Sequence, residues 1–197
     1  SPLVAELLCV RGLDTPEKAA SFLASGPEQL HDPFLLRDME PACARISAAL
    51  DRGEIIAVYG DYDVDGITST CLMTHFLRSR GATVLPYIPD RLEEGYGLNC
   101  DALHALSQAG VSLVITVDCG ITAREEADYA AALGLDLVMT DHHECKDALP
   151  AAVAAVDPCR PDCPYPFKQL AGVGVALKLA LALTPEAARP QVWSAYA

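Results

Sequence analysis

From residue 54 onward, the chain alternates short apolar runs with amphipathic stretches. The apolar runs, several of them rich in β-branched residues, cover residues 55–59, 83–88, 113–117, 137–140 and 152–156. The stretches between them cover residues 67–80, 100–109 and 123–133, with apolar residues at helical spacing. Strands that alternate with helices form parallel sheets that are covered on both faces and joined by right-handed crossovers. The pattern therefore predicts an α/β fold with a parallel five-stranded sheet and helices on both faces.

The first 53 residues carry helix signals and no strand pattern. Thr15, followed by Pro16 and Glu17, is typical of a helix start, because Thr caps helices and Pro is tolerated in the first turn. Asp38 is expected to cap a second helix that runs to about residue 50. We therefore expect a short helical N-terminal segment at residues 1–53 and a sheet domain at residues 54–197.

A last helix is predicted from about residue 172 to residue 183. Pro185 ends or interrupts this helix, and Pro190 is expected to break the chain again. Lys178 lies in its most apolar part. We expect the lysine amine to be solvated, with phosphate binding as the alternative.

Composition limits the classes of function. The chain has 27 Asp and Glu against 14 Lys and Arg, a formal net charge of −13, which excludes a small cationic DNA-coating protein. No run of 18 apolar residues and no cationic leader occurs, so neither a membrane span nor secretion is expected. The eight scattered cysteines are expected to be reduced, buried thiols of a cytoplasmic protein. A zinc site at Cys159 and Cys163 is a less favoured alternative.

Acidic residues and histidines directly follow three of the predicted strands. The set consists of Asp61, Asp63 and Asp65 after the first strand, Asp118 after the third, and Asp141, His142 and His143 after the fourth. Ligands of parallel α/β sheets bind beyond the carboxyl ends of the strands, which all lie along one edge. These side chains are therefore expected to meet.

A metal site is the physical interpretation of this cluster. Burying several carboxylates together costs several kcal/mol per ion unless cations compensate their charge. Oxygen ligands suit hard divalent ions, and an added imidazole favours Mn²⁺ over Mg²⁺. Two such ions roughly 4 Å apart form a clamp for attack on phosphorus. The N-terminus of the helix that starts near residues 66–68 would also offer backbone N–H groups to a phosphate.

Each of these residues also has a purely structural interpretation. Asp65 could cap the following helix, and Asp118, which precedes Gly120, could be a turn residue. A pair of adjacent histidines is often solvated. The coincidence of all these residues at the ends of successive strands favours the metal site.

Three stretches resemble the first three motifs of the DHH phosphoesterase superfamily: residues 60–66, 116–120 and 141–143. Three more stretches, at residues 31–39, 87–98 and 170–176, are similar to its bacterial RecJ branch of single-strand-DNA-specific exonucleases. The resemblance covers nearly the whole chain. It implies that residues 54–197 form a DHH phosphoesterase domain.

The resemblance implies 5′-to-3′ hydrolysis of phosphodiester bonds in single-stranded DNA, in DNA repair and recombination, with two divalent ions, Mn²⁺ preferred or Mg²⁺. By motif, the candidate metal ligands are Asp61, Asp63, Asp65, Asp118, Asp141 and His142, with Asp118 as the bridge and with Asp61 and Asp141 as ligands or their partners. Asp141 and His143 are the candidate catalytic residues, and His143 resembles the family's phosphate-facing histidine. Tyr59 stands where some family members have a histidine, which would leave the first metal one ligand short.

The candidate substrate-binding residues are Arg91, Tyr96, Gly172 and Gly174. Arg91 could meet a phosphate and Tyr96 could stack on a base. In the structural alternative, Arg91 pairs with Glu93 or Glu94. The two glycines at residues 172 and 174 lack the third glycine of a dinucleotide fingerprint and would permit close backbone packing or approach to nucleic acid.

The resemblance also implies parts outside these 197 residues. The family has a fourth-motif Asp that completes the metal site, and it has a second domain and an OB-like DNA-binding domain. We therefore expect this chain to be a truncated catalytic part that binds metal weakly and is nearly inactive. Its implied partners are single-stranded DNA, the C-terminal domains of the same protein, a helicase and a single-strand-binding protein. The acidic charge places most of the DNA-gripping basic surface in those other domains.

Two other functions stay open from the sequence. The first is another DHH phosphoesterase activity, on oligoribonucleotides, cyclic dinucleotides or pyrophosphate, which residues 1–50 and 87–98 disfavour. The second is a non-catalytic, RecJ-like DNA-binding module that has lost its metal ligands. This second alternative is opposed by the intact candidate ligands Asp63, Asp65, Asp118, Asp141 and His142.

Overall fold

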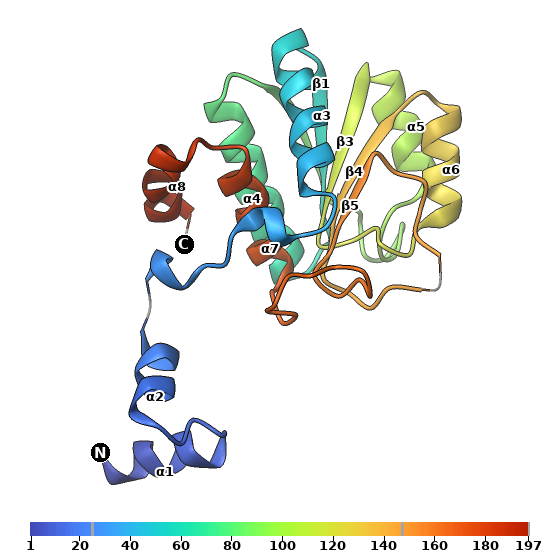
Figure 1. Cartoon of the computed structure of the whole chain (residues 1–197). Helices are drawn as coiled ribbons and strands as arrows, with labels where there is room; N and C mark the ends of the chain where they lie inside the picture. Colours follow the sequence, from blue (N-terminus) through green and yellow to red (C-terminus); the bar gives the residue numbers. More distant parts are fainter. Residues whose placement is uncertain (25, 147, 197) are drawn as a thin grey trace. The chain divides into compact units, whose positions relative to one another are not determined.

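A parallel five-stranded sheet forms the core of the larger of two compact units (Figure 1). The computed structural model describes residues 1–24, 26–146 and 148–196 and divides the chain into two compact units, residues 1–32 and 33–197. The strands of the second unit are β1 (Ile55–Tyr59), β2 (Thr83–Tyr87), β3 (Val111–Val117), β4 (Asp136–Thr140) and β5 (Ala154–Val156). The five predicted strands and their parallel direction are therefore confirmed, although β5 is shorter than predicted at its start.

Helices cover both faces of the sheet, as the alternating pattern predicted (Figure 1). One face carries α3 (Met39–Arg52), α4 (Val64–Ser79) and α7 (Gly172–Ala182). The opposite face carries α5 (Cys100–Gln108) and α6 (Arg124–Ala132). Because both faces of the central strands are buried, the strands have continuous apolar runs instead of alternating ones. In β1, for example, Ile56 and Val58 join one core and Ala57 and Tyr59 join the other.

The strand order is β2-β1-β3-β4-β5. After β2 the chain crosses back over β1 to form β3, so the crevice between β1 and β3 is the point where the winding reverses. Ligands of open α/β sheets bind at such a switch point. The register places Tyr59, the last residue of β1, beside Thr116 of β3. The loops that follow β1 and β3 therefore leave the sheet side by side.

Helix α3 packs against β5 and α7, although it precedes the first strand. Its apolar stripe of Met39, Ala42, Ile46 and Ala49 is buried in the core of the sheet. Packing therefore groups residues 33–53 with the sheet, whereas the change in sequence pattern placed the start of the sheet domain at residue 54.

Asp38 does not cap α3, contrary to the prediction. It has a φ of 62°, and its side chain makes no capping hydrogen bond. The carboxylate instead accepts hydrogen bonds from Arg160 Nη1 at 2.5 Å and from the N–H of Ala155 at 3.3 Å. Asp38 therefore joins the start of α3 to β5 and to the loop beyond it.

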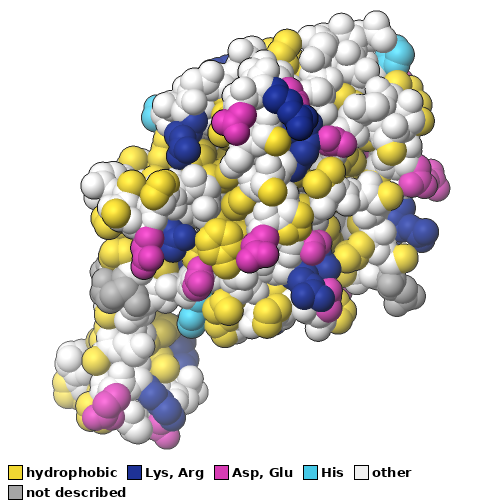
Figure 2. Space-filling model, turned by 45° about the horizontal axis from the view of Figure 1, so that its top comes forward, with side chains coloured by type: hydrophobic (Ala, Val, Ile, Leu, Met, Phe, Trp, Pro, Cys, Tyr) yellow, Lys and Arg dark blue, Asp and Glu magenta, His cyan; other side chains and the backbone are white. Residues whose placement is uncertain are grey.

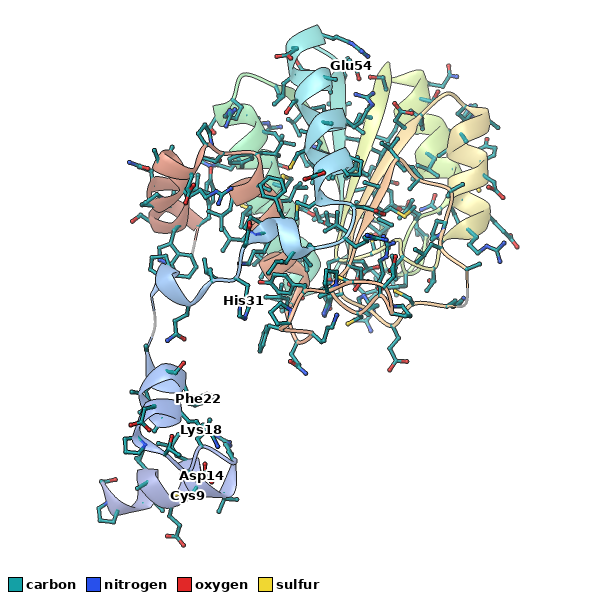
Figure 3. All side chains as sticks on the ribbon, viewed as in Figure 1. Cys9, Asp14, Lys18, Phe22, His31 and Glu54 are labelled. Carbon is teal, nitrogen blue, oxygen red and sulfur yellow. The ribbon has the colours of Figure 1, made fainter. Side chains whose placement is uncertain are left out.

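The first unit contains α1 (Pro2–Val10), α2 (Pro16–Leu23) and the short 3₁₀ turn η1 (Pro27–Gln29). Thr15 caps α2 as predicted, because its Oγ1 accepts a hydrogen bond from the N–H of Lys18 at 3.3 Å. The amine of Lys18 pairs with Asp14 at 2.7 Å (Figure 3). Neither α1 nor α2 buries a residue.

Two expectations for the C-terminal region are wrong. Pro190 does not break the chain but lies in the first turn of α8 (Arg189–Tyr196), where the missing N–H is not needed. The side chain of Lys178 is not solvated: the residue is 1% exposed, and its amine lies 5.5 Å from the ring centroid of Tyr165. The 3₁₀ turns η2 (Pro33–Leu35) and η3 (Glu186–Ala188) complete the second unit.

All eight cysteines are free thiols, but not all are buried as expected. Cys9, Cys71 and Cys100 are exposed. In the described part of the chain, neither Cys159 nor Cys163 belongs to a group that could hold a metal. No helix of the described residues combines the length and the apolar character that a membrane crossing requires.

Candidate metal centre

The loop after β1 turns sharply into α4. The carboxylate of Asp63 caps this helix and accepts hydrogen bonds from the N–H groups of Asp65 at 2.9 Å and Gly66 at 3.0 Å. A Cβ at residue 66 would lie 2.6 Å from the backbone of Asp61, so only glycine fits there. The structural alternative in which Asp65 caps the helix is wrong, because Asp63 takes that place and Asp65 lies in the first turn.

Asp65 joins α4 to the start of α7. Its two carboxylate oxygens accept hydrogen bonds from the N–H groups of Gly172 and Val173, both at 2.7 Å. A carboxylate at a helix N-terminus satisfies donors that have no partner within the helix and opposes the positive end of the helix dipole. One oxygen of Asp65 also lies 3.6 Å from Nε2 of His142.

Asp118 follows β3 in a left-handed conformation, with a φ of 61°. Such a conformation costs a non-glycine residue about 1–3 kcal/mol and is typical of functional sites. The side chain is 2% exposed and lies against Gly172, where a Cβ would come within 2.6 Å of the Cβ of Asp118. The two candidate glycines therefore differ: Gly172 touches the acidic cluster, whereas Gly174 packs against Leu170.

Asp141 holds the start of the loop after β4. Its carboxylate accepts hydrogen bonds from the N–H groups of Ile121 at 2.9 Å and His142 at 2.8 Å. It also lies 2.6 Å from Nδ1 of His143. Burial by itself would raise the pKa of Asp141, but the hydrogen bonds from His143 and Ile121 outweigh it and lower that pKa. The ring of His143 is thereby fixed through Nδ1.

Two groups of side chains converge closely enough to hold metal ions. The ligand atoms of Asp61, Asp63 and Asp118 lie within 4.8 Å of one another, and so do those of Asp118, His142 and His143. Asp118 belongs to both groups. Asp65 and Asp141 lie beside the groups, with their carboxylates engaged by backbone N–H groups.

The electrostatics of the shared residue fit a cation. Burial, followed by the charges of Asp65 and Asp63, raises the pKa of Asp118 to about 7. Burial also raises the pKa of Asp61. Among the described residues, Oδ1 of Asp61 and Oδ1 of Asp118 are buried without a hydrogen-bond partner, although Nε2 of His142 lies 3.0 Å from the latter. Leaving such an acceptor unsatisfied costs about 1–3 kcal/mol, which a divalent cation would remove.

The loop between β2 and α5 carries Arg91 and Tyr96, the candidate substrate-binding residues outside α7, and brings them beside the two metal-ligand groups. The guanidinium carbon of Arg91 lies 5.2 Å from the ring centroid of Tyr62, which stands between Asp61 and Asp63 in the sequence. The hydroxyl of Tyr96 lies 3.4 Å from Nδ1 and 3.5 Å from Nε2 of His143. Within the described residues Arg91 pairs with neither Glu93 nor Glu94, so that structural alternative is wrong.

With this geometry established, residues 55–196 match the family described as "DHH family, N-terminal domain". The chain belongs to the DHH family. Its match begins at the first residue of β1, so the DHH domain starts in sequence where the strand pattern starts.

The chain is similar to curated proteins named single-stranded-DNA-specific exonuclease RecJ. It is 52% identical to the protein of Bacillus subtilis over 94% of this chain and 24% of that protein. It is 38% identical to the protein of Escherichia coli over 92% of this chain and 31% of that protein. The chain thus spans about a quarter to a third of the length of these relatives.

Solved structures show the same fold. An exonuclease RecJ bound to manganese matches 75% of this chain and 37% of its own, with a TM-score of 0.69 and 37% identity. RecJ of Thermus thermophilus in complex with Mn²⁺ matches 93% of this chain and 27% of its own, with a TM-score of 0.65 and 30% identity. The fold expected from the sequence resemblance is therefore confirmed.

The DHH domain has a further buried acid that the sequence reasoning missed. Asp157 directly follows β5, is completely buried and accepts a hydrogen bond from the N–H of Cys159 at 2.6 Å. Burial raises its pKa to about 6. The signal was available, because Asp157 ends the last apolar run as Asp118 and Asp141 end theirs.

Tyr59 supports the loop between β2 and α5. Its buried hydroxyl donates a hydrogen bond to the carbonyl of Gly97 at 2.9 Å, and its ring stacks on Tyr87 with 4.9 Å between centroids. This residue, where some family members have a histidine, is therefore occupied in holding the backbone of the loop.

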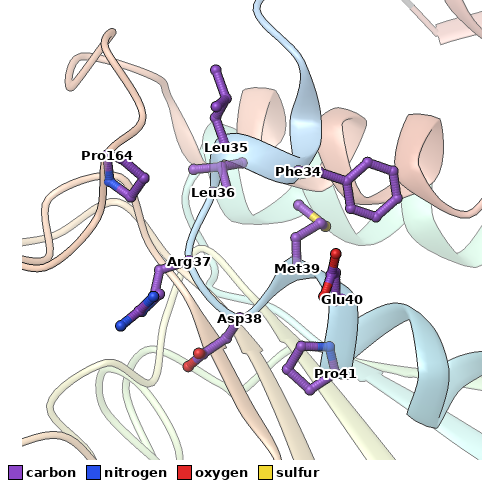
Figure 4. A pocket seen from close by; sticks show the side chains of 9 residues that line it. All are labelled: Phe34, Leu35, Leu36, Arg37, Asp38, Met39, Glu40, Pro41 and Pro164. Atoms are coloured by element: carbon purple, nitrogen blue, oxygen red, sulfur yellow. The ribbon is translucent and has the colours of Figure 1, made fainter.

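Two surface features lie apart from the metal-ligand groups. On the face shown in Figure 2, the coloured Lys and Arg side chains are scattered among Asp and Glu and form no continuous basic band. A cavity of about 350 Å³ at the start of α3 is lined by residues 34–41 and Pro164 (Figure 4). None of the candidate site residues lines this cavity.

Proposed function

We propose that this chain is the metal-holding catalytic part of a single-strand-specific DNA exonuclease that hydrolyses phosphodiester bonds from the 5′ end in repair and recombination. The observation that carries the proposal is Asp118, a buried carboxylate shared by two ligand groups at the switch point of the sheet. The names of the relatives supply the substrate and the specificity for single strands.

The residues would hold two divalent ions, Mn²⁺ in preference to Mg²⁺. Asp61 and Asp63 would bind the first, His142 would bind the second, and Asp118 would bridge them, while Asp65 orients His142 and α7. Ions in these places would supply Lewis acidity and charge neutralisation for the attack of water on phosphorus. The mixed carboxylate and imidazole donors favour Mn²⁺. The manganese in two solved RecJ structures supports the same choice.

His143 would face the substrate instead of a metal. The hydrogen bond to Asp141, as the largest cause, raises the pKa of His143 to about 9, so the imidazole is cationic near neutral pH. A cationic imidazole has no lone pair for a metal, and its Nε2–H can donate to a phosphoryl oxygen. Asp141 would therefore act catalytically by keeping His143 charged and oriented.

Arg91 and Tyr96 would bind the DNA strand at the rim of this centre. Arg91 offers a guanidinium to a phosphate, and Tyr96 offers a ring to a base next to His143. Gly172 would contribute by letting α7 approach Asp118 closely. Gly174 remains a candidate for substrate approach at the start of the same helix.

The test uses a full-length protein that contains this chain, with Asp118→Asn as the variant and Asp157→Asn as the matched control. Both changes replace a buried carboxylate at a strand end by an isosteric amide. We expect Asp118→Asn to reduce the release of mononucleotides from 5′-labelled single-stranded DNA by more than about 100-fold, and Asp157→Asn to retain activity. Unchanged cleavage by Asp118→Asn would overturn the metal assignment. Preference of the wild type for dinucleotides or pyrophosphate would assign another DHH phosphoesterase activity.

The proposal extends to partners and location. The formal net charge of −13 supports a basic DNA-gripping surface in further domains of the same protein, and single-stranded DNA is the proposed substrate. A helicase and a single-strand-binding protein as partners, and a cytoplasmic location, are parts of the proposal that rest on the family resemblance alone.

A further inference from the structure

One acidic side chain in the loop between β2 and α5 collects three hydrogen bonds. Oε2 of Glu94 accepts from the hydroxyl of Tyr87 at 2.5 Å and from Nδ2 of Asn99 at 2.9 Å. Oε1 of Glu94 accepts from the N–H of Asp90 at 2.7 Å. These three donors come from the end of β2, the start of the loop and the cap of α5. The Glu94 carboxylate therefore ties both ends of the loop together.

The loop backbone is fixed around this carboxylate at other points. The carbonyl of Asp90 accepts hydrogen bonds from the N–H groups of Glu94 at 2.8 Å and Gly95 at 3.2 Å. Asn99 Nδ2 also donates to the hydroxyl of Tyr59 at 3.2 Å, which in turn donates to Gly97. Among the described residues, the side chain of Glu94 accepts hydrogen bonds from Tyr87 and Asn99, at the two ends of the loop, whereas that of Asp90 accepts from Leu92 and Glu93 within it.

The two residues that this arrangement presents to the metal centre flank Glu94 in the sequence. Arg91, three residues before it, lies over Tyr62, and Tyr96, two residues after it, reaches His143. The rings of Tyr62 and Tyr96 meet edge to face, with 6.4 Å between centroids. A shift of the loop would move the guanidinium and the phenol together, because both are carried by the same turn.

We propose that Glu94 is a positioning residue for the DNA strand, whose carboxylate fixes the loop in the conformation that holds Arg91 and Tyr96 beside the metal centre. This role rests on the proposed nuclease function, because it assigns Arg91 and Tyr96 to the substrate. Among the described residues, the hydrogen bonds of Glu94 involve Tyr87, Asp90 and Asn99 and none of the metal-ligand groups. Its effect reaches the substrate through the loop.

The three contacts suit an ionised carboxylate, which offers acceptors on both oxygens. All three partners donate to Glu94. A side chain that carries acceptors and no donor can satisfy all three at once. The hydrogen bond from Tyr87, as the largest cause, lowers the pKa of Glu94, in agreement with a carboxylate that is held in its charged form. In a Glu94→Gln variant the amide NH₂ would face at least one donor. Glutamine is therefore a poor replacement in spite of its matching shape.

The first test compares Glu94→Gln with Glu93→Gln in the full-length protein. Both variants remove one negative charge from the same loop, but the side chain of Glu93 accepts no hydrogen bond within the described residues. We expect Glu94→Gln to raise the KM for single-stranded DNA about 10-fold with kcat within about twofold, and Glu93→Gln to leave both unchanged. In an Arg91→Ala background, Glu94→Gln should raise the KM by less than it does in the wild type, because part of its effect passes through Arg91 and residues that act through one another are not additive. An unchanged KM, or full additivity with Arg91→Ala, would overturn the positioning role.

The second test reads the loop without using enzyme activity. Leu92 is 94% exposed, so trypsin can reach the bond after Arg91. We expect cleavage there to be several-fold faster in Glu94→Gln than in Glu93→Gln, after each rate is divided by that of the matching 88–100 peptide. Tyr87→Phe, which removes one of the three donors, should give a smaller increase. Equal normalised rates would overturn the loop-holding role even if the protein proves not to be a nuclease, which separates the two failures.

Discussion

The ends of β3 and β5 each carry a buried aspartate, yet the two sites differ in kind. Asp118 and Asp157 are 2% and 0% exposed, and burial raises the pKa of each, to about 7 and about 6. Asp157 accepts a hydrogen bond from the N–H of Cys159, whereas Oδ1 of Asp118 has no hydrogen-bond partner in the described chain and lies 3.0 Å from Nε2 of His142. Asp118 is also joined by Asp61, Asp63 and the histidines. Burial of an acid is therefore a weak sign of a metal site, and an unsatisfied oxygen among converging ligands is a strong one.

The largest expected difference is in metal affinity. Asp118→Asn should weaken the binding of both Mn²⁺ ions by more than about 100-fold, because it removes an oxygen that both groups share. Asp157→Asn should leave the affinity for both Mn²⁺ ions unchanged. Isothermal titration calorimetry of both variants measures this contrast, and equal manganese affinities would remove the distinction between the two strand ends.

Single-group variants should separate the two ions. Asp63→Asn and His142→Ala each remove a ligand from one group only. Each should lower the affinity for one Mn²⁺ ion by about 10–100-fold and leave the other ion bound. At moderate metal concentration, the measured number of bound ions should therefore fall from two to one. Electron paramagnetic resonance of bound Mn²⁺ would report the loss of coupling between the ions. Loss of both ions in either variant would contradict the assignment of separate groups.

Glycine substitutions in α7 test how closely this helix must approach Asp118. Gly172→Ala would bring a Cβ within 2.6 Å of the Cβ of Asp118, and we expect it to destabilise the chain by about 1–3 kcal/mol and to weaken manganese binding. Gly174→Ala is the control, because its Cβ meets only the flexible Leu170 side chain at 3.3 Å. The control should be near neutral, since alanine also favours the helix by up to about 1 kcal/mol. Urea denaturation of both variants gives the comparison.

The last expected effect is a change in the stability of Asp157→Asn that depends on pH. The folded pKa of Asp157, about 6, lies above its ordinary value of 3.8, so ionisation of this carboxylate opposes folding. That penalty is absent below about pH 4, grows as the pH rises toward 6 and is complete above it. The variant should therefore be more stable than the wild type by about 1–3 kcal/mol at pH 7.5, with little difference at pH 4. A difference that does not depend on pH would mean that the Asp157 charge is not the cause.

Local sequence signals predicted most of the fold. Apolar runs located the five strands, and helical spacing located α4, α5, α6 and α7 to within a few residues. Local signals were least reliable for polar side chains that can interact either with a residue nearby in the sequence or with one far away. Asp38 bonds to Arg160 instead of capping α3, and Lys178 lies against Tyr165 instead of in solvent. Such choices depend on segments far away in sequence.

The candidate site was predicted in composition but not in arrangement. The sequence placed Asp61, Asp63, Asp118, His142 and His143 at strand ends, and the structure brings these five into two overlapping groups. It did not indicate that Asp63 caps α4, that Asp65 receives the N-terminus of α7, or that Glu94 holds the loop. Each of these roles is defined by a hydrogen bond whose geometry no periodicity encodes.

The sequence by itself determined which residues lie at the carboxyl ends of the strands. Each acid directly follows a buried apolar run, and the strand ends where that run ends. Only the tertiary structure decided which ends are neighbours. In the order β2-β1-β3-β4-β5, β1 pairs with β3, although β2 and two helices lie between them in the sequence. Pairing between strands distant in sequence depends on how both faces pack, so the meeting of Asp61 and Asp63 with Asp118 is a property of the folded sheet.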